Sequence, residues 1–266
     1  MSENIWYNLF CNNFRRDKKF QGFSQEALDF LLGIRLNNDR EWFEPRKKIY
    51  TEKIFEPMKE LGQEIFKPFE DNEDMVCKVG RIYRDEHFPP YLHYRDVLWI
   101  YVRYDAYYWN RTPTLYFELS PEGAEFGFRI SKPEAAVMER FRAQLSEDAE
   151  PFLKMAENLE RDFGLTFGGD EYKRKKPCSV PEAERFFLKK GLSAYVKVTD
   201  RKELFSSKLR EHIDRVFQAL VPLNDYFHEI VEIEAIAKAL EKESEPEPEE
   251  VSLIDSVKAP DVDFMW

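Results

Sequence analysis

The chain has 266 residues, a net charge of -11 and a hydrophobic fraction of 43%, which suits a folded chain with a sizeable core. It holds no apolar run near the roughly 20 residues of a membrane helix and no signal-peptide pattern, so we expect no membrane association. Its three cysteines, Cys11, Cys77 and Cys178, match neither a zinc spacing nor a disulfide framework. They fit a reducing compartment, and we expect a cytoplasmic protein without a cofactor.

The negative charge is concentrated in the last part of the sequence. Residues 241–266 hold nine acidic and two basic side chains, a net of -7, which leaves -4 for residues 1–240. A protein that grips nucleic acid usually presents a basic face, so nucleic-acid binding is not expected. We interpret 241–266 as an acidic, disordered tail. Its residues Phe264-Met265-Trp266 either fold back, dock a protein partner, or have no role.

Residues 1–22 are interpreted as an N-terminal extension of a single domain over 23–240. Ser24 predicts the cap of a first helix, and Asn37-Asn38-Asp39 predict the start of a second. Pro45 and Pro57 predict kinks or a break in that second helix, since each removes a backbone donor.

The sequence predicts strands over 75–84 and 94–105, a hairpin over 114–130, and a short strand over 193–199. The hairpin signal is the clearest, because apolar residues alternate on both sides of Ser120-Pro121-Glu122-Gly123, which is a turn sequence. One face of the hairpin is expected to be buried.

Helices are predicted to flank these strands. After the hairpin they begin near Ser131, Ala149, Ser179 and Asp200, the last ending before Pro222, and a final helix covers about 224–240. The fold class is therefore α+β, with a mostly antiparallel sheet (about 75–131 plus 193–199) and helices before and after it in sequence.

The stretch from Val79 to Tyr94 is unusually rich in aromatic and charged residues. On a strand, Arg81, Tyr83 and Asp85 would share one face and Arg84 the other. An arginine beside tyrosines is able to clamp a carboxylate or phosphate through its planar fork.

The start of the second predicted helix offers further donors. Asn37 and Arg40 lie there, and helix N-termini favour anions. The structural alternative is an ion-pair network of Arg40, Glu41 and Asp85 that ties the helix to the sheet.

Three other groups have a functional and a structural interpretation. His87 and His93 lie near Asp85, but a metal site needs three or four converging ligands, so we expect no metal. The aromatic cluster suits stacking of a base or sugar, or packing in the core; it comprises Trp99, Tyr101, Tyr104, Tyr107, Tyr108 and Trp109. The basic run Lys173 to Lys176 would meet a phosphate or remain a solvated loop.

Two motifs carry a family resemblance. Asn37-Asn38-Asp39-Arg40-Glu41-Trp42-Phe43, followed by Pro57 and Leu61, resembles the first signature of the domain of unknown function 2461 family, and Arg81-Ile82-Tyr83-Arg84-Asp85 resembles its second. Residues Tyr116 to Gly127, Lys173-Arg174 and Pro222-Leu223 are similar to its later landmarks. The resemblance covers about residues 23–233 and implies a shared fold, with no activity to carry over.

One segment departs from the family pattern. The family usually continues its second motif with a lysine-rich loop before a Pro-Tyr-Lys, whereas the segment from Asp85 to Leu92 is shorter and lacks those lysines. An anion site built by such lysines is therefore not expected here.

Two hypotheses for the function follow. The first is a protein that binds a small molecule, anionic or sugar-like, with catalysis left open. The second is a non-catalytic protein-interaction module that uses the aromatic surface and residues 241–266. The candidate ligand-binding residues are Asn37, Asn38, Arg40, Trp42, Arg81, Tyr83, Arg84, Asp85, His87, Tyr91, Lys173 and Arg174.

Overall fold

The computed structural model describes residues 19–85, 87, 89, 91–106, 111–174 and 177–244, without the side chains of 241–244. Most of the predicted N-terminal extension and of the acidic tail therefore lies outside the described residues. So do the predicted aromatic residues Tyr107, Tyr108 and Trp109.

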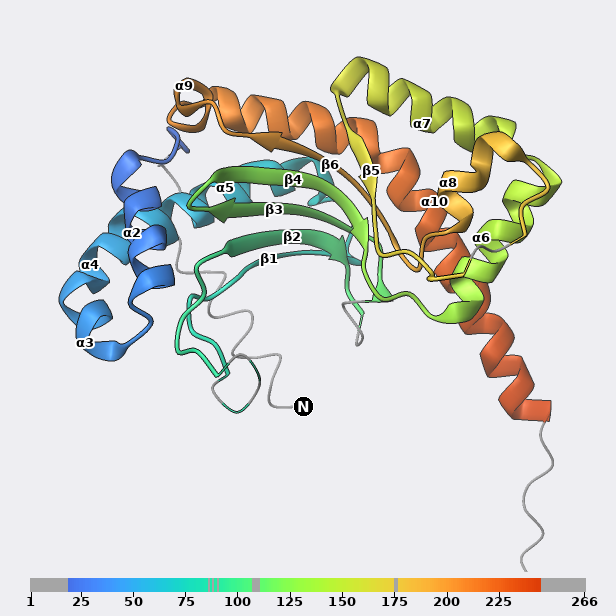
Figure 1. Cartoon of the computed structure of the whole chain (residues 1–266), viewed down its shortest axis with the longest axis horizontal. Coiled ribbons are helices and arrows are strands. Elements are labelled where there is room, and N and C mark those ends of the chain that lie inside the picture. The colour runs from blue at the N-terminus through green and yellow to red at the C-terminus, as the bar shows by residue number, and fades with distance from the viewer. Residues whose placement is uncertain are drawn as a thin grey trace, which may run out of the picture.

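Six strands of the described chain form one antiparallel sheet in the order β1-β2-β3-β4-β6-β5 (Figure 1). Together with the helices this confirms the predicted α+β class. The strands are β1 (Met75–Val79), β2 (Leu98–Tyr104), β3 (Thr114–Ser120), β4 (Gly123–Ile130), β5 (Thr166–Gly168) and β6 (Leu192–Val198).

The first predicted strand is shorter than expected. It ends at Val79, and beyond it only the isolated bridge between Tyr83 and Tyr94 is strand-like. Gly80 lies against the ring of Trp99, where a Cβ atom would come within 2.5 Å of the indole, and the chain leaves the sheet there. The predicted extent of this strand was therefore wrong, although Arg81, Tyr83 and Asp85 are exposed and Ile82 is buried, as the predicted alternation requires.

The N-terminal helices follow the predicted signals closely. Helix α2 (Gln25–Leu36) is capped by Ser24, and α3 (Arg40–Phe43) by Asp39. The rest of the second predicted helix is interrupted, as the two prolines predicted. It consists of a 3-10 turn (Glu44–Arg46), α4 (Lys47–Ile49), a π-helical turn (Tyr50–Phe55), α5 (Glu56–Phe66) and a last 3-10 turn (Lys67–Phe69).

Helix α10 is the longest element and corrects one prediction. It runs unbroken from Lys208 to Ser244 with Pro222 inside it, where the sequence predicted two helices. Leu220 and Leu223, on either side of the proline, are fully buried, so packing outweighs the roughly 3 kcal/mol that an interior proline costs. The other late helices are α6 (Ala135–Glu147), α7 (Glu150–Phe163), a 3-10 turn (Pro181–Ala183), α8 (Glu184–Phe187) and α9 (Arg201–Leu204).

The core lies between one face of the sheet and helices α2, α5 and α10. Phe117 of β3 stacks on Phe23 with ring centroids 5.8 Å apart, and Phe128 of β4 packs on Phe227 of α10 at 5.6 Å. Figure 1 shows α5 and α10 along the same side of the curved sheet. None of the described helices combines the length and the apolar composition that a membrane crossing requires.

Candidate functional site

The two segments that carry the predicted ligand residues do meet, through Asn38. Its Nδ2 group donates to the carbonyls of Ile34 (3.3 Å) and Tyr94 (3.0 Å), and its Oδ1 atom accepts from the Tyr94 N–H at 2.9 Å. The ring of Phe43 stacks on Tyr94 with centroids 4.2 Å apart. The junction is therefore closed by side-chain packing and by backbone hydrogen bonds.

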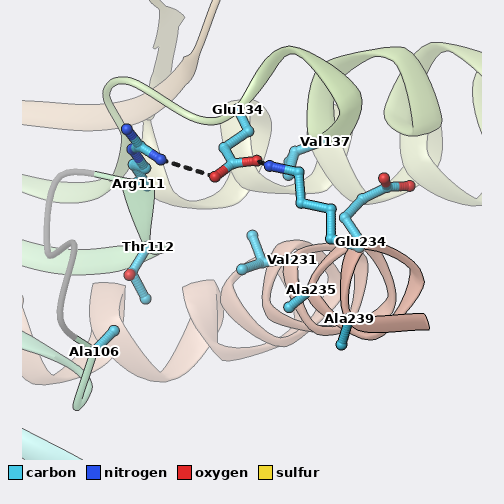
Figure 2. Close-up of a pocket in the computed structure, with 10 residues that line it drawn as sticks. Ala106, Arg111, Thr112, Glu134, Val137, Val231, Glu234, Ala235 and Ala239 are labelled. Atoms are coloured by element: carbon cyan, nitrogen blue, oxygen red, sulfur yellow. Dashed lines mark hydrogen bonds and ion pairs between the residues drawn. The ribbon is translucent and has the colours of Figure 1, made fainter. Parts of the chain in front are cut away.

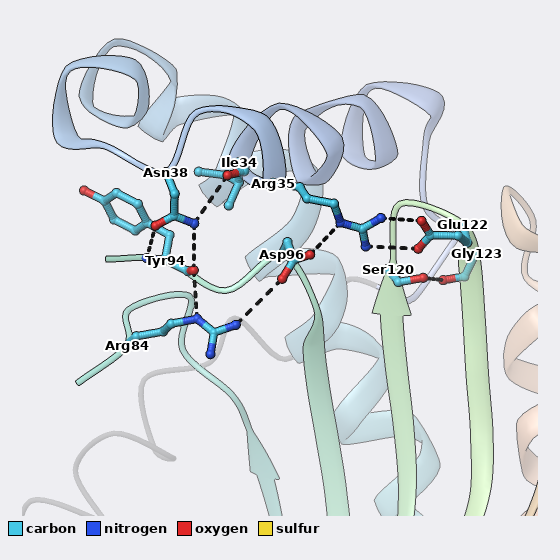
Figure 3. Close-up of polar contacts among 9 residues, drawn as sticks. All are labelled: Ile34, Arg35, Asn38, Arg84, Tyr94, Asp96, Ser120, Glu122 and Gly123. Carbon is cyan, nitrogen blue, oxygen red and sulfur yellow. Dashed lines mark hydrogen bonds and ion pairs between the residues drawn. The ribbon is translucent and has the colours of Figure 1, made fainter. Parts of the chain in front are cut away.

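Charged residues extend this junction to the sheet (Figure 3). Arg84 donates to the Tyr94 carbonyl at 3.0 Å and lies 3.7 Å from Asp96. Arg35 of α2 binds Asp96 at 2.6 Å and holds both carboxylate oxygens of Glu122, in the β3–β4 turn. The Arg35 guanidinium lowers the pKa of Glu122 to about 2. Ion pairs thus tie α2 to the sheet. The structural alternative proposed a different network, of Arg40, Glu41 and Asp85 at the next helix, and that network stays a prediction.

The remaining candidates of this region lie around the junction and do not line a described cavity. Trp42 packs on Phe30 and lies over Gly33, where a Cβ atom would be 2.3 Å from the indole. Asp85 accepts a hydrogen bond from the His87 backbone at 3.0 Å. The other candidates here are exposed at the surface: Asn37, Arg40, Arg81, Tyr83 and Tyr91.

Lys173 and Arg174 lie at the other end of the sheet. They belong to the connection from β5 to β6, which leaves the sheet where Gly168 pairs with Ser193. The junction around Asn38 lies at the opposite strand ends, next to the β3–β4 turn. The predicted site residues therefore form two separate groups.

A different polar surface emerges on the face of the sheet turned away from α2, α5 and α10. Strand registers place outward side chains in three rows across the strands, which we call the outer face. From one row to the next these are Trp99, Glu118, Glu125 and Lys197; then Tyr101, Tyr116, Gly127 and Tyr195; then Arg103, Thr114, Arg129 and Ser193.

The centre of the outer face is organised by Arg129. Its guanidinium lies 4.0 Å from the Tyr116 ring centroid, pairs with Glu118 at 2.7 Å and donates to the Tyr101 hydroxyl at 2.9 Å. Burial lowers the pKa of Arg129, but Glu118 and the two tyrosines raise it further, so the net direction is upward. Arg129 is therefore a fixed cation whose main partners belong to the protein.

Glu125 forms a second polar centre beside it. The Tyr116 hydroxyl donates to Glu125 at 2.7 Å, and Lys197 lies 3.3 Å from the other carboxylate oxygen. Burial and this bond to an acceptor raise the pKa of Tyr116 well above its ordinary value. The hydroxyl thus stays protonated and keeps Glu125 in place.

A cavity of about 240 Å³ opens beside these residues; we call it the β4–β6 cavity. Its walls combine Tyr116, Glu125 and Arg129 with Ser193 and Tyr195 of β6. Its far wall is backbone from the strand ends, where glycines allow close approach. The remaining lining residues are Ile130, Ser131, Gly169, Asp170, Gly191 and Leu192.

A second cavity, of about 450 Å³, lies between α6 and α10 (Figure 2); we call it the α6–α10 cavity. Its floor is formed by small apolar side chains, among them Val137, Val231 and Ala235. At its rim Glu134 pairs with Arg111 at 2.8 Å and with Lys238. Its charges are thus paired, and its interior is apolar.

Within the described part of the chain, no three His, Cys, Asp or Glu side chains cluster as they would around a metal ion. Nδ1 of His212 lies 2.6 Å from Glu203, and His228 stacks on Tyr104 with ring centroids 3.5 Å apart. These two histidines are used in packing between elements.

The outer face as a whole was not identified from the sequence, although Trp99 and Tyr101 belong to the aromatic cluster considered there. Its signal was present, because Thr114, Tyr116 and Glu118 alternate with apolar residues in the predicted hairpin. The prediction assigned the hairpin one buried face, but Thr114 and Tyr116 are only 5% and 2% exposed. Bulky polar side chains at alternate strand positions were the available clue.

Comparison with known proteins adds a family and no activity. No curated protein matches the chain. The family model described as "Conserved hypothetical protein (DUF2461)" matches residues 26–226, which include the junction around Asn38 and the outer face. The chain therefore belongs to the DUF2461 family.

Proposed function

We propose that this protein binds a small polar molecule, anionic or sugar-like, in the β4–β6 cavity. The observation that supports this most directly is the convergence of three strands on one hollow, each contributing a polar side chain. Tyr116 comes from β3, Glu125 and Arg129 from β4, and Ser193 and Tyr195 from β6. Concave sites with a few convergent polar groups are the usual places for small ligands.

The junction around Asn38 supports ligand binding less well. There Asn38 and Arg84 bind backbone carbonyls, and such bonds hold a fold together whether or not a ligand is present. Around Arg129 and Glu125 the hydrogen bonds join side chains to one another beside an open cavity.

Saturation-transfer NMR against a panel of sugars, sugar phosphates and small carboxylic acids tests this proposal. A ligand of the cavity should bind the wild type, and Tyr195→Ala should weaken it about tenfold or more, because the ring forms one wall. Tyr83→Ala is the matched control, since Tyr83 is 45% exposed at the other end of the sheet. Equal effects of the two substitutions on every ligand would contradict the proposal.

A second candidate function, a protein-interaction module, is supported by the end of α10. Ile236 and Leu240 are 60% and 61% exposed there, beside the α6–α10 cavity, and large exposed apolar side chains in one place are typical of interaction surfaces. Pull-downs with the wild type, the double variant Ile236→Ser/Leu240→Ser and a chain that ends at 244 test it. An identical set of captured proteins would remove this candidate.

A further inference from the structure

We infer that the ligand of the β4–β6 cavity is a neutral, hydroxyl-rich molecule of the size of a sugar ring, and not an anion. This inference rests on the proposed function and narrows its ligand class. It depends on which charges of the outer face are already paired, and on which groups are left to meet a ligand.

The first step concerns Arg129, the one arginine among the described residues that line the cavity. The Arg129 guanidinium forms an ion pair with Glu118, donates to the Tyr101 hydroxyl and lies over the Tyr116 ring. Both hydrogen-bonding contacts use its Nη2 atom, so an anion bound at the other N–H groups would share the guanidinium with Glu118. Because Glu118 already compensates this positive charge at 2.7 Å, Arg129 attracts a further anion only weakly.

The second step is the balance of charge around the cavity. Two carboxylates, Glu125 and Asp170, line it together with Arg129. Lys197 is paired with Glu125, and Glu118 neutralises Arg129. With these pairs formed, Asp170 is the unbalanced charge among the described residues that line the cavity. A like charge brought into this place is repelled, whereas a neutral ligand is not.

The third step is the kind of polar group that remains. Ser193 and Tyr195 carry hydroxyls that make no hydrogen bond within the described residues, and Ser131 adds another at the same wall. Hydroxyls both donate and accept, and the Glu125 carboxylate accepts. Alternating donors and acceptors on a ligand, as on a polyol ring, suit this set.

The fourth step is shape. Gly127 lies between Tyr116 and Tyr195 across three strands, so the sheet carries no side chain between the two rings. On the neighbouring strand β5, Gly168 leaves space for the Tyr195 ring. A Cβ atom at Gly168 would lie 3.1 Å from Cε1 of Tyr195. The result is a notch with an aromatic wall and polar ends, which fits the apolar face and the hydroxyl rim of a sugar.

The test compares neutral monosaccharides and disaccharides with their own phosphate esters and acids, by saturation-transfer NMR and calorimetry on the full chain. A neutral sugar should bind, and its phosphate should bind about tenfold more weakly or worse. Glu125→Gln should lower the affinity for the neutral sugar and should reduce the difference in affinity between the sugar and its phosphate ester. Tyr195→Phe should retain most of the contact with the ring and lose only the hydroxyl.

The outcomes separate the inference from the proposed function. If a sugar phosphate or acid binds more tightly than its neutral parent, and Tyr195→Ala abolishes that binding, the inference is overturned and the proposed function stands. If no member of the panel binds in a way that depends on Tyr195, both fail. Ser193→Ala serves as a second variant should Tyr195→Ala not fold, which circular dichroism would show.

Discussion

Asn38 is a residue whose place in the structure differs from what its sequence context favours. It lies two positions before Arg40, near the start of a helix, where hydrogen-bond donors favour a bound anion. In the structure both ends of its amide pair with the backbone of Tyr94, 56 positions later. Side-chain amides that imitate a strand partner in this way fix one segment against another.

Replacing Asn38 with alanine should destabilise the protein by about 2 kcal/mol, because three hydrogen bonds are lost and the Tyr94 backbone is left without these partners. The neighbouring Asn37→Ala removes one exposed side-chain bond, to Gly33, and should cost well under 1 kcal/mol. Urea unfolding gives both values. Similar losses for the two variants would show that the junction is not held by Asn38.

Gly127 is a second residue whose identity matters, because the outer face has no room for a side chain at this position. A Cβ atom there would lie 2.0 Å from the Ala194 carbonyl oxygen, so the strands β4 and β6 would have to separate. Gly127→Ala should cost about 3 kcal/mol or more in unfolding free energy.

Gly164→Ala is the control for Gly127→Ala, because Gly164 also has a positive φ, 66°, but nothing lies within 4 Å of its Cβ position. It should cost only about 1 kcal/mol, from the backbone conformation alone. Should the two variants unfold at the same denaturant concentration, the close approach of β4 and β6 would be disproved.

At the scale of elements, the sequence predicted those features that interactions between neighbouring residues determine. The hairpin of β3 and β4, the caps of α2 and α3 and the breaks at Pro45 and Pro57 depend on neighbours in sequence. Strand β5 was missed, because three residues carry no periodicity and its pairing with β6 is a tertiary contact. The continuity of α10 through Pro222 was missed for the same reason.

Pro222→Ala should stabilise the protein by about 1 to 3 kcal/mol. The proline side chain is exposed, and alanine would restore a donor inside a helix that is continuous on both sides. Pro121→Ala in the β3–β4 turn is the control and should leave stability unchanged or slightly lower. Thermal unfolding decides, and a destabilised Pro222→Ala would mean that the proline shapes the packing of α10.

The pair of Arg35 and Glu122 links α2 to the β3–β4 turn and predicts a pH dependence. Because the folded pKa of Glu122 is lowered from 4.5 to about 2, its contribution is fully present above pH 4.5 and is lost as the pH falls toward 2. The Glu122 side chain is 62% exposed, so solvent screening keeps the contribution below about 1 kcal/mol.

Glu122→Gln should therefore lower stability at neutral pH and have almost no effect near pH 2, which urea unfolding at the two pH values measures. Added salt should reduce the difference between the variants. A variant that is destabilised equally at both pH values would show that the ion pair contributes little and that lost packing is responsible.

At the scale of the whole molecule, the candidate site is a product of topology. Tyr116, Arg129 and Tyr195 are separated by many positions and share a surface only because β3, β4 and β6 are neighbours. A single sequence predicts the alternation within each strand, but not which strands lie side by side. The fold class was therefore predictable, while the cavity became visible only once strand order was known.

The long final helix has a consequence for how the molecule is made. Helix α10 contributes Phe217, Leu220 and Phe227 to the core, all at most 1% exposed, and it packs on both β3 and β4. During translation these residues leave the ribosome after the six strands of the described sheet have already emerged. Until then the part of the apolar side that α10 covers is open to water and to other nascent chains, and such exposure promotes aggregation. Chains that terminate before this helix should therefore aggregate or depend on chaperones, whereas chains that include it should not.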